Sequence, residues 1–277
     1  MRVWNSKPAL ECVHRKKEIM REYKLSAILV TKNEEKKIRR CLESIRWVDE
    51  IVVVDQSSSD NTVAICKEYT DKVFVVSPKG FCEPDRPTAL AHTTCEWVLY
   101  LDADEEVSPA LKEEITGLLS GAPEYSSYYI PRKNIFLGKW IKGSGWYPGY
   151  VLRLFRKDAV SFSGRIHTDL SPVGSFGYLK NHLEHYTCED LEEYLRKTNR
   201  YTGILAEQEY QKGSRITRLN VIFKLVFFPC AYGARKFFLQ KGFIDAAHGL
   251  LIAYLTALTI FLMNVKIWEI QRRNRQV

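Results

Sequence analysis

The sequence predicts an α/β fold with a mostly parallel sheet flanked by helices, a small antiparallel extension and apolar helices at the C-terminus. Three observations lead to this prediction. Short apolar runs alternate with amphipathic helical segments from residue 25 to about residue 120, as in parallel sheets with crossover helices. After this point, strand-like segments follow one another between Gly- and aromatic-rich loops. From Leu219 onward the composition becomes apolar.

The composition fits one large domain with an appendage. The chain has 277 residues, of which 45% are hydrophobic, and a net charge of +8 that suits anionic partners. We divide it into a basic leader (1–24), an α/β domain (25–212) and a membrane-associated helical tail (213–277). The seven cysteines are scattered without a CxxC pair, which favours a reducing cytosolic setting over disulfides or zinc. The leader contains no apolar core of signal-peptide length.

The first half of the domain is expected to place several strand ends at one edge of the sheet. Buried strands are predicted at 25–31, 50–55, 71–76 and 97–101. Because parallel strands are joined by right-handed connections, the loops that follow them gather at one edge. Thr31, Asp55 and Asp102 each end or follow such a strand and should share that edge, while Asp60 should cap the helix at 61–69.

The most informative stretch is WVLYLDADEE, residues 97–106, in which an apolar strand ends in four carboxylates. A hard divalent cation, Mg²⁺ or Mn²⁺, would offset their mutual repulsion, and we predict that Asp102 and Asp104 share one, directly or through water. The alternative is an acidic first turn for the following helix. That interpretation fits Glu105 and Glu106, but it does not explain two aspartates at the end of a buried strand, where such sheets bind ligands.

The second half is predicted to contain strands at 125–136, 149–155 and 160–170, followed by a charged amphipathic helix at 191–211. Residues 246–265 include no Lys, Arg, Asp or Glu over 20 positions, which just reaches the length of a bilayer span. This segment could cross the bilayer, lie in its interface or pair with another subunit. Basic residues on both sides suit anionic headgroups but leave the orientation open, so we predict a peripheral or single-span membrane protein.

Four ordered motifs resemble those of a known family. TKNEEKKIRRCLESI, VVVDQSSSDNT and YLDADEE resemble the three N-terminal motifs of family 2 glycosyltransferases with the GT-A fold. RKNIFLGKWIKGSGWYPGYVLRLFRKDAVSFSGRIH, with the helix EDLEEYLRKTNRYT after it, resembles the lipopolysaccharide-core glucosyltransferase-like branch of that family. The resemblance extends over roughly residues 24–270.

The resemblance implies an inverting, metal-dependent transfer of a hexose from a nucleotide-sugar to a lipid-linked or membrane saccharide. The family's commonest donors are UDP-linked, and the branch acts at the cytoplasmic face of the cell membrane. By position, the nucleotide-sugar would contact Thr31, Asn33, Glu34, Asp55, Arg86 and Asp102. Asp102 and Asp104 would hold the metal, and the donor-sugar and acceptor side would be formed by Arg132, Asn134, Trp146 and Arg153.

The general base is where the chain departs from the family pattern. Relatives usually have His-Glu where this sequence has His167-Thr168, with Asp169 next. We place Asp169 before His167 as the base, although a shift of one residue along a strand turns a side chain to the other face. His167 is the alternative base or a further metal ligand. Gly149 and Pro87 also replace residues that are common in the branch.

Other interpretations remain open from the sequence. Glu34 could be first-turn charge, Arg153 could be solvated, and for His182 and His185 a polar-surface role is favoured. A nucleotidyltransferase would share the sheet but would need a basic, Gly-rich loop where TKNEE stands. A membrane-tethered relative that binds a nucleotide-sugar or glycan without turnover is also considered. No basic helix or aromatic-basic platform suggests nucleic acid, and the oligomeric state is left open.

Overall fold

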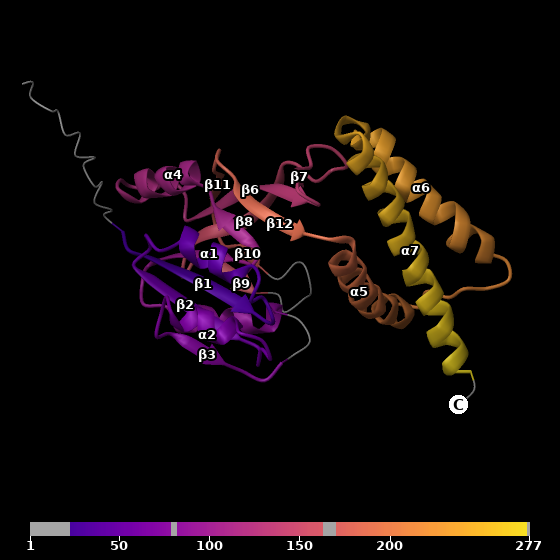
Figure 1. The fold of residues 1–277 in the computed structure, drawn as a ribbon, viewed down its shortest axis with the longest axis horizontal. Coiled ribbons are helices and arrows are strands. Elements are labelled where there is room, and N and C mark those ends of the chain that lie inside the picture. Colours follow the sequence, from indigo (N-terminus) through magenta and orange to yellow (C-terminus); the bar gives the residue numbers. More distant parts are fainter. Residues whose placement is uncertain (1–22, 79–81, 163–169, 276–277) are drawn as a thin grey trace, which may run out of the picture.

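The computed structural model describes residues 23–78, 82–162 and 170–275. A sheet domain occupies one side of the molecule and a group of long helices the other, with the strand β12 leading from one to the other (Figure 1). His167 and Asp169, the two candidate bases, lie outside the described residues.

Four parallel strands form the first half of the sheet, in the order β3-β2-β1-β4. These are β1 (Leu25–Thr31), β2 (Glu50–Asp55), β3 (Val73–Val75) and β4 (Trp97–Leu101), with helices α1 (Ile38–Ser44), α2 (Thr62–Lys67) and α3 (Arg86–Ala91) and the 3-10 turn η1 (Glu83–Asp85) between them. Thr31 pairs with Asp55 in the register of β1 and β2, so these strand ends lie side by side at one edge. Asp60 accepts a hydrogen bond at 3.0 Å from the backbone N–H of Thr62, the first residue of α2, but the cap position of α2 is Asn61, which makes no side-chain cap bond. The predicted cap residue therefore lies one position before the cap.

The second half extends the same sheet to ten strands. Antiparallel pairing joins β8 (Gly149–Arg156) to β4 and to β6 (Ser127–Phe136), while β12 (Leu183–Cys188) runs parallel to β6. The remaining strands of this sheet are β5 (Glu105–Val107), β7 (Lys139–Trp140) and β11 (Phe176–Tyr178). A separate two-stranded sheet consists of β9 (Val160–Phe162) and β10 (Leu170–Pro172). The predicted α/β class with an antiparallel extension is confirmed.

One local prediction was wrong. Glu105 and Glu106 do not open a helix but form β5, which pairs antiparallel with β12. The helix α4 (Pro109–Leu119) starts three residues later, where the Ser108 hydroxyl accepts the Leu111 backbone N–H. The physical reason is the partner strand: β12 offers free backbone groups that a short extended segment can pair with.

Alternate side chains of the central strands enter two cores, one on each face of the sheet. Leu29 packs with α1 and α4 on one face, and Ile28 packs with α3 on the other; all are buried. This explains why the strands read as continuous apolar runs. Burial on both faces fixes the strands rigidly, and therefore fixes the position of the polar residues at their ends.

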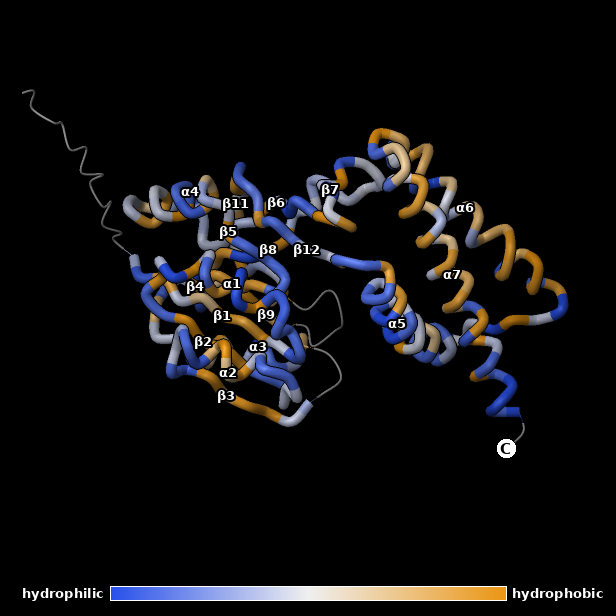
Figure 2. The backbone as a smooth tube through the Cα atoms, in the orientation of Figure 1, coloured by the Kyte–Doolittle hydropathy of each residue, from blue (hydrophilic) through white to orange (hydrophobic). Residues whose placement is uncertain are grey.

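The C-terminal part is helical. It contains α5 (Leu191–Gln211), which has the predicted bounds, then η2 (Phe223–Phe227), α6 (Phe228–Ala234) and η3 (Arg235–Leu239) as one continuous helix, η4 (Gly242–Asp245), and α7 (Ala247–Arg273). Among the described helices, α7 is the one that is long and apolar enough to cross a membrane by length and composition. Figure 2 shows that α5 is mostly hydrophilic and that α6 is mostly hydrophobic.

Candidate active site

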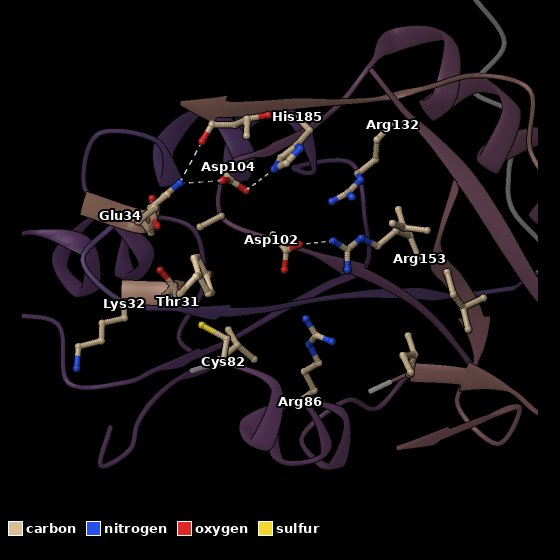
Figure 3. A pocket seen from close by; sticks show the side chains of 18 of the residues that line it. Thr31, Lys32, Glu34, Cys82, Arg86, Asp102, Asp104, Arg132, Arg153 and His185 are labelled. Atoms are coloured by element: carbon tan, nitrogen blue, oxygen red, sulfur yellow. Dashed lines mark hydrogen bonds and ion pairs between the residues drawn. The ribbon is translucent and has the colours of Figure 1, made fainter. Parts of the chain in front are cut away.

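A cavity of about 810 Å³ opens at the carboxyl ends of β1 and β4, between β8, β12 and α5. It is the kind of position at which open α/β sheets bind ligands. Seven of the residues predicted for the site line it, namely Thr31, Glu34, Arg86, Asp102, Asp104, Arg132 and Arg153 (Figure 3). The strand ends thus bring together residues that lie more than a hundred positions apart in the sequence.

Asp102 sits at the centre of a buried ionic network. Arg153 donates to Asp102 and, at 2.8 Å, to Oε1 of Glu105, while the Tyr100 hydroxyl donates to Oδ1 of Asp102 at 2.5 Å. Burial raises the pKa of Asp102, but the guanidinium groups of Arg153 and Arg86 hold that pKa well below its usual range. Arg153 is therefore not solvated, as one interpretation allowed; it fixes the orientation of the Asp102 carboxylate.

Asp104 faces a histidine that the sequence did not single out for this role. His185 Nε2 lies 3.5 Å from Asp104 Oδ1, and His185 Nδ1 is 2.7 Å from Asn134 Oδ1. The orientation of the Asn134 amide is fixed because its Nδ2 donates to the Trp146 carbonyl at 2.8 Å, so its oxygen must face His185. Nδ1 of His185 is therefore the protonated nitrogen.

In its neutral form, His185 then turns the lone pair of Nε2 towards a carboxylate oxygen. Two facing lone pairs repel, so either a second proton on the imidazole or a bound cation must lie between them. A histidine oriented by a hydrogen bond from its other nitrogen is also a common form of metal ligand. The favoured polar-surface role of His185 is thus corrected. His182, by contrast, hydrogen-bonds to the Tyr147 hydroxyl at 2.8 Å.

A lysine from α5 completes this side of the cavity. Lys197 Nζ lies 3.7 Å from Asp104 Oδ2 and 3.1 Å from Glu193 Oε1. Burial and the nearby charge of Asp104 raise the pKa of Glu34 to about 7, so this carboxyl is poised between its two forms. Lys197 was not predicted as a site residue, because the charge pattern of α5 does not indicate which face of the helix packs on the sheet.

The polar wall of the cavity includes two atoms without a partner among the described residues. Thr31 Oγ1 and Arg132 Nε are both buried and unpaired there. Buried polar atoms are normally hydrogen-bonded, so these two are suited to a polar ligand. On the opposite side of Asp102, Arg86 stacks over the Tyr100 ring and donates to its hydroxyl at 2.9 Å.

Four predicted residues are not among those that line the cavity. The Asp55 carboxylate accepts hydrogen bonds from Ser58 N at 2.7 Å and from Ser58 Oγ, and Oδ1 of Asn33 accepts from Ser59 N at 2.8 Å. These bonds tie the two loops after β1 and β2 to each other and to the sheet. Asn134 orients His185, as described above, and the Trp146 ring packs edge-to-face on Phe136 at 5.6 Å.

Within the described ranges, no group of three or more His, Cys, Asp or Glu side chains is arranged to hold a metal ion. The oxygen and nitrogen atoms of Asp104 and His185, with Asp102 beside them, offer an incomplete ligand set. Mg²⁺ and Mn²⁺ accept such a set when phosphate oxygens and water supply the remaining ligands.

The family model described as glycosyl transferase family 2 matches residues 26–176, more than half of the chain. The chain belongs to glycosyl transferase family 2. It is therefore a glycosyltransferase that uses a nucleotide-sugar. The cavity at the carboxyl edge of its sheet is the candidate active site for this reaction.

Relatives of this family 2 glycosyltransferase extend the match to nearly the whole chain. The lipopolysaccharide core biosynthesis glycosyltransferase LpsC of Rhizobium meliloti (strain 1021) is 30% identical, covering 86% of this chain and 92% of LpsC. The uncharacterized glycosyltransferase RT0209 of Rickettsia typhi is 27% identical, covering 92% and 90%. Among solved structures, the mannosyltransferase PcManGT from Pyrobaculum calidifontis has a TM-score of 0.49 and 15% identity, over 88% of this chain and 87% of that one. The expected resemblance to the lipopolysaccharide-core branch is confirmed by the LpsC match.

Proposed function

We propose that the protein is an inverting, divalent-metal-dependent hexosyltransferase. It would take its sugar from a UDP-linked donor and pass it to a lipid-linked or membrane-borne saccharide. The observation that carries the proposal is the facing pair of Asp104 and His185, 3.5 Å apart beside Asp102 on the cavity wall. The LpsC relative, named for lipopolysaccharide core biosynthesis, supports an acceptor of the cell envelope.

The metal fits the residues that are present. Asp104 and His185 would bind Mg²⁺ or Mn²⁺, with Asp102 held next to them by Arg153. A cation held by these residues would supply positive charge to offset the negative charge of a departing diphosphate. Arg86 and Arg132 line the same cavity and add positive charge for the phosphates.

The nucleoside would lie at the ends of β1 and β2. Thr31 and Glu34 line that part of the cavity, and the unpaired Thr31 hydroxyl is suited to a hydrogen bond with the ligand. Asp55 and Asn33 shape the surrounding loops through their bonds to Ser58 and Ser59. We retain both as nucleotide-binding candidates, and we assign the sugar and acceptor side to Arg132, Asn134, Trp146 and Arg153.

An inverting transfer also needs a base that removes the proton from the acceptor hydroxyl as its oxygen attacks the sugar. Asp169 remains our first candidate and His167 the second. Matched variants Asp169→Asn and His167→Asn separate them: loss of the base should lower the turnover number by about 100-fold or more while donor affinity is kept. If both variants kept the turnover number of the wild type, neither residue would be the base.

The tail, residues 213–277, would bring the enzyme to the cytoplasmic face of the cell membrane, where the acceptor is anchored. The division into leader, catalytic domain and membrane-associated tail is part of the proposal. The tail's one long apolar helix supports it by length and composition.

A donor screen tests the proposed function. Purified protein is incubated with UDP-, GDP- and ADP-sugars in Mn²⁺ or in EDTA, and the release of nucleoside diphosphate is measured. We expect slow hydrolysis of a UDP-sugar that EDTA abolishes, together with a rise in melting temperature when donor and Mn²⁺ are both present. Release that is equally fast in EDTA would contradict the metal assignment, and release from GDP- or ADP-sugars alone would contradict the donor.

A further inference from the structure

The helix formed by residues 221–239 turns its large apolar side chains away from the protein. Its exposed apolar residues are Ile222, Phe223, Val226, Phe227, Phe238 and Leu239, of which Phe227 is 63% and Leu239 78% exposed. Its buried positions include Pro229 and Gly233. A Cβ atom at Gly233 would lie 2.8 Å from the Ala253 carbonyl oxygen of α7, so small residues face inward. This is the reverse of a helix in a soluble protein, and an apolar face of this size calls for a partner.

The charge of the same region favours one kind of partner. Residues 213–277 contain ten Lys and Arg but two Asp and Glu, so this tail accounts for a net charge equal to that of the whole chain. One of the two acids, Asp245, is buried. Arg218, Arg235 and Lys241 are exposed beside the apolar face. A second copy of the chain would bring like charges together, whereas an anionic lipid surface complements both the charge and the apolar face.

The packing of α7 against the rest of the protein limits how the tail can bind a bilayer. Ile252 and Leu255 in the first half of α7 pack on Phe136 and Ile141 of the sheet domain. In the second half, Lys266 Nζ donates to Oδ1 of Asn199 at 2.7 Å on α5. One side of α7 is thus covered by the sheet domain and by the charged helix α5 along most of its length. A bilayer crossed by α7 would have to take in these polar elements as well, at a high cost in desolvation.

The hairpin turn is also fixed to the sheet domain. The Asp245 carboxylate accepts the backbone N–H groups of Lys142 and Gly143, the latter at 2.6 Å, and Lys236 Nζ donates to the Ser144 carbonyl at 2.8 Å. Swinging α7 out to span a membrane would leave the buried carboxylate of Asp245 unpaired. The hairpin is therefore a fixed part of the molecule.

We propose that the continuous helix 221–239 and α7 form a hairpin that lies flat on an anionic membrane surface, with the outer face of helix 221–239 immersed at the level of the headgroups. This orientation has a consequence for the proposed transferase function, on which it partly rests. Helix α5 lines the cavity with Lys197 and Arg200 and contacts α7 on its other side, and α7 in turn packs on helix 221–239, so these three helices lie between the cavity and the lipid surface. A lipid-borne acceptor would then have to extend its saccharide past these helices to reach the cavity, while its lipid stays in the membrane.

Depth measurements on the full-length chain test the flat orientation. Cys230 is exposed on this helix, and with Cys12→Ser and Cys82→Ser in place it takes a fluorescent thiol label. Two further proteins carry the label at Ile222→Cys or Leu239→Cys with Cys230→Ser; the two sites lie about 25 Å apart along the helix. On phosphatidylglycerol vesicles with spin-labelled lipids, we expect equal, shallow quenching at all three positions. Deepest quenching at Cys230 would indicate a span and would overturn the proposal.

A second experiment tests whether the outer face of helix 221–239 binds the membrane and whether the binding requires anionic lipid. In co-sedimentation, we expect binding to phosphatidylglycerol vesicles to be at least about tenfold tighter than to phosphatidylcholine, and Phe227→Asp to weaken it by about tenfold or more. Val173→Asp is the matched control, because Val173 is 53% exposed in the sheet domain and should have no effect. A stable dimer in solution that Phe227→Asp dissociates would assign the face to a second copy and refute the proposal. Hydrolysis of a soluble donor reports separately on the transferase function and should be unchanged in Phe227→Asp.

Discussion

Two half-buried glutamates at opposite edges of the sheet have pKa values shifted in opposite directions. At the amino edge, Glu50 accepts from Ser26, from Lys72 and, at 2.8 Å, from the Thr94 backbone N–H. Burial raises its pKa, but these bonds outweigh burial and lower that pKa to about 2. At the carboxyl edge, burial and Asp104 raise the pKa of Glu34 to about 7. The carboxylate of Glu50 is thus fully paired with hydrogen-bond donors and a positive charge, whereas the carboxylate of Glu34 has too little positive charge beside it.

The difference separates the structural edge of the sheet from the functional one. Charges at the amino edge are compensated within the protein, so they contribute to stability. At the carboxyl edge, burial raises the pKa of Asp104 but His185 and Lys197 lower it overall, whereas Glu34 beside it stays short of positive charge. A local excess of negative charge of this kind is the condition under which a cation binds. Asp102 lies between these cases, because Arg153 compensates it from within the fold while it still lines the cavity.

The largest effect is expected for Arg153→Met. Arg153 is buried between Asp102 and Glu105, and its removal leaves both carboxylates without their main counter-charge. We expect a loss of about 3–5 kcal/mol in the free energy of unfolding, measured by urea denaturation. If the variant does not fold, Arg153→Met combined with Glu105→Gln should recover part of the loss. A single variant within 1 kcal/mol of the wild type would show that the network is not a structural unit.

Asp104→Asn should affect activity more than stability. The substitution removes a charged ligand from the proposed cation site, and we expect turnover to fall by about 100- to 1000-fold. The melting temperature should change less than in Arg153→Met, since the partners of Asp104 lie 3.5 and 3.7 Å away and one of them, Lys197, also pairs with Glu193. Asp158→Asn is the control, because Asp158 is exposed on the same domain. If Asp104→Asn hydrolysed the donor as fast as the wild type, Asp104 would not be a ligand of the proposed cation.

Glu50→Gln tests the structural edge. Because the pKa of Glu50 is about 2 in the folded protein and 4.5 in the unfolded chain, its contribution is fully present above pH 4.5 and is lost as the pH falls towards 2. We expect the variant to be about 2 kcal/mol less stable at pH 7. The gap between variant and wild type should close between pH 4.5 and pH 2, and a gap that does not depend on pH would exclude an ionic origin.

Glu34→Gln should give the smallest effect, with the opposite sign. The folded protein holds the Glu34 proton more tightly than the unfolded chain, so wild-type stability falls as the pH rises from 4.5 through 7. In metal-free buffer, the variant should be more stable than the wild type at pH 8 by about 1 kcal/mol and equal to it near pH 4.5. Glu113→Gln on the surface of α4 serves as the control. A variant that is less stable than the wild type at pH 8 would mean that the protein stabilises the charged carboxylate of Glu34, as it does that of Glu50.

The site itself was predictable in part, because local sequence reports on strand ends. The apolar runs predicted where the strands lie. Because the carboxyl ends of parallel strands share one edge, Thr31 and Asp102 were predicted to lie close together. The pairing of Asp104 with His185 was not predictable in this way. His185 is 81 positions further on, and it reaches Asp104 because β12 runs parallel to β6 and pairs with β5.

The sequence by itself determined the alternation of strands and helices, the motifs of family 2 and an apolar tail of about bilayer length. The tertiary structure decided which partner each charged or apolar group meets. Arg153 became an internal counter-ion because β8 pairs with β4, and α7 was given a covered side because α5 packs along it. Hydropathy and charge are properties of single residues and short windows, whereas burial and pairing depend on contacts between distant segments.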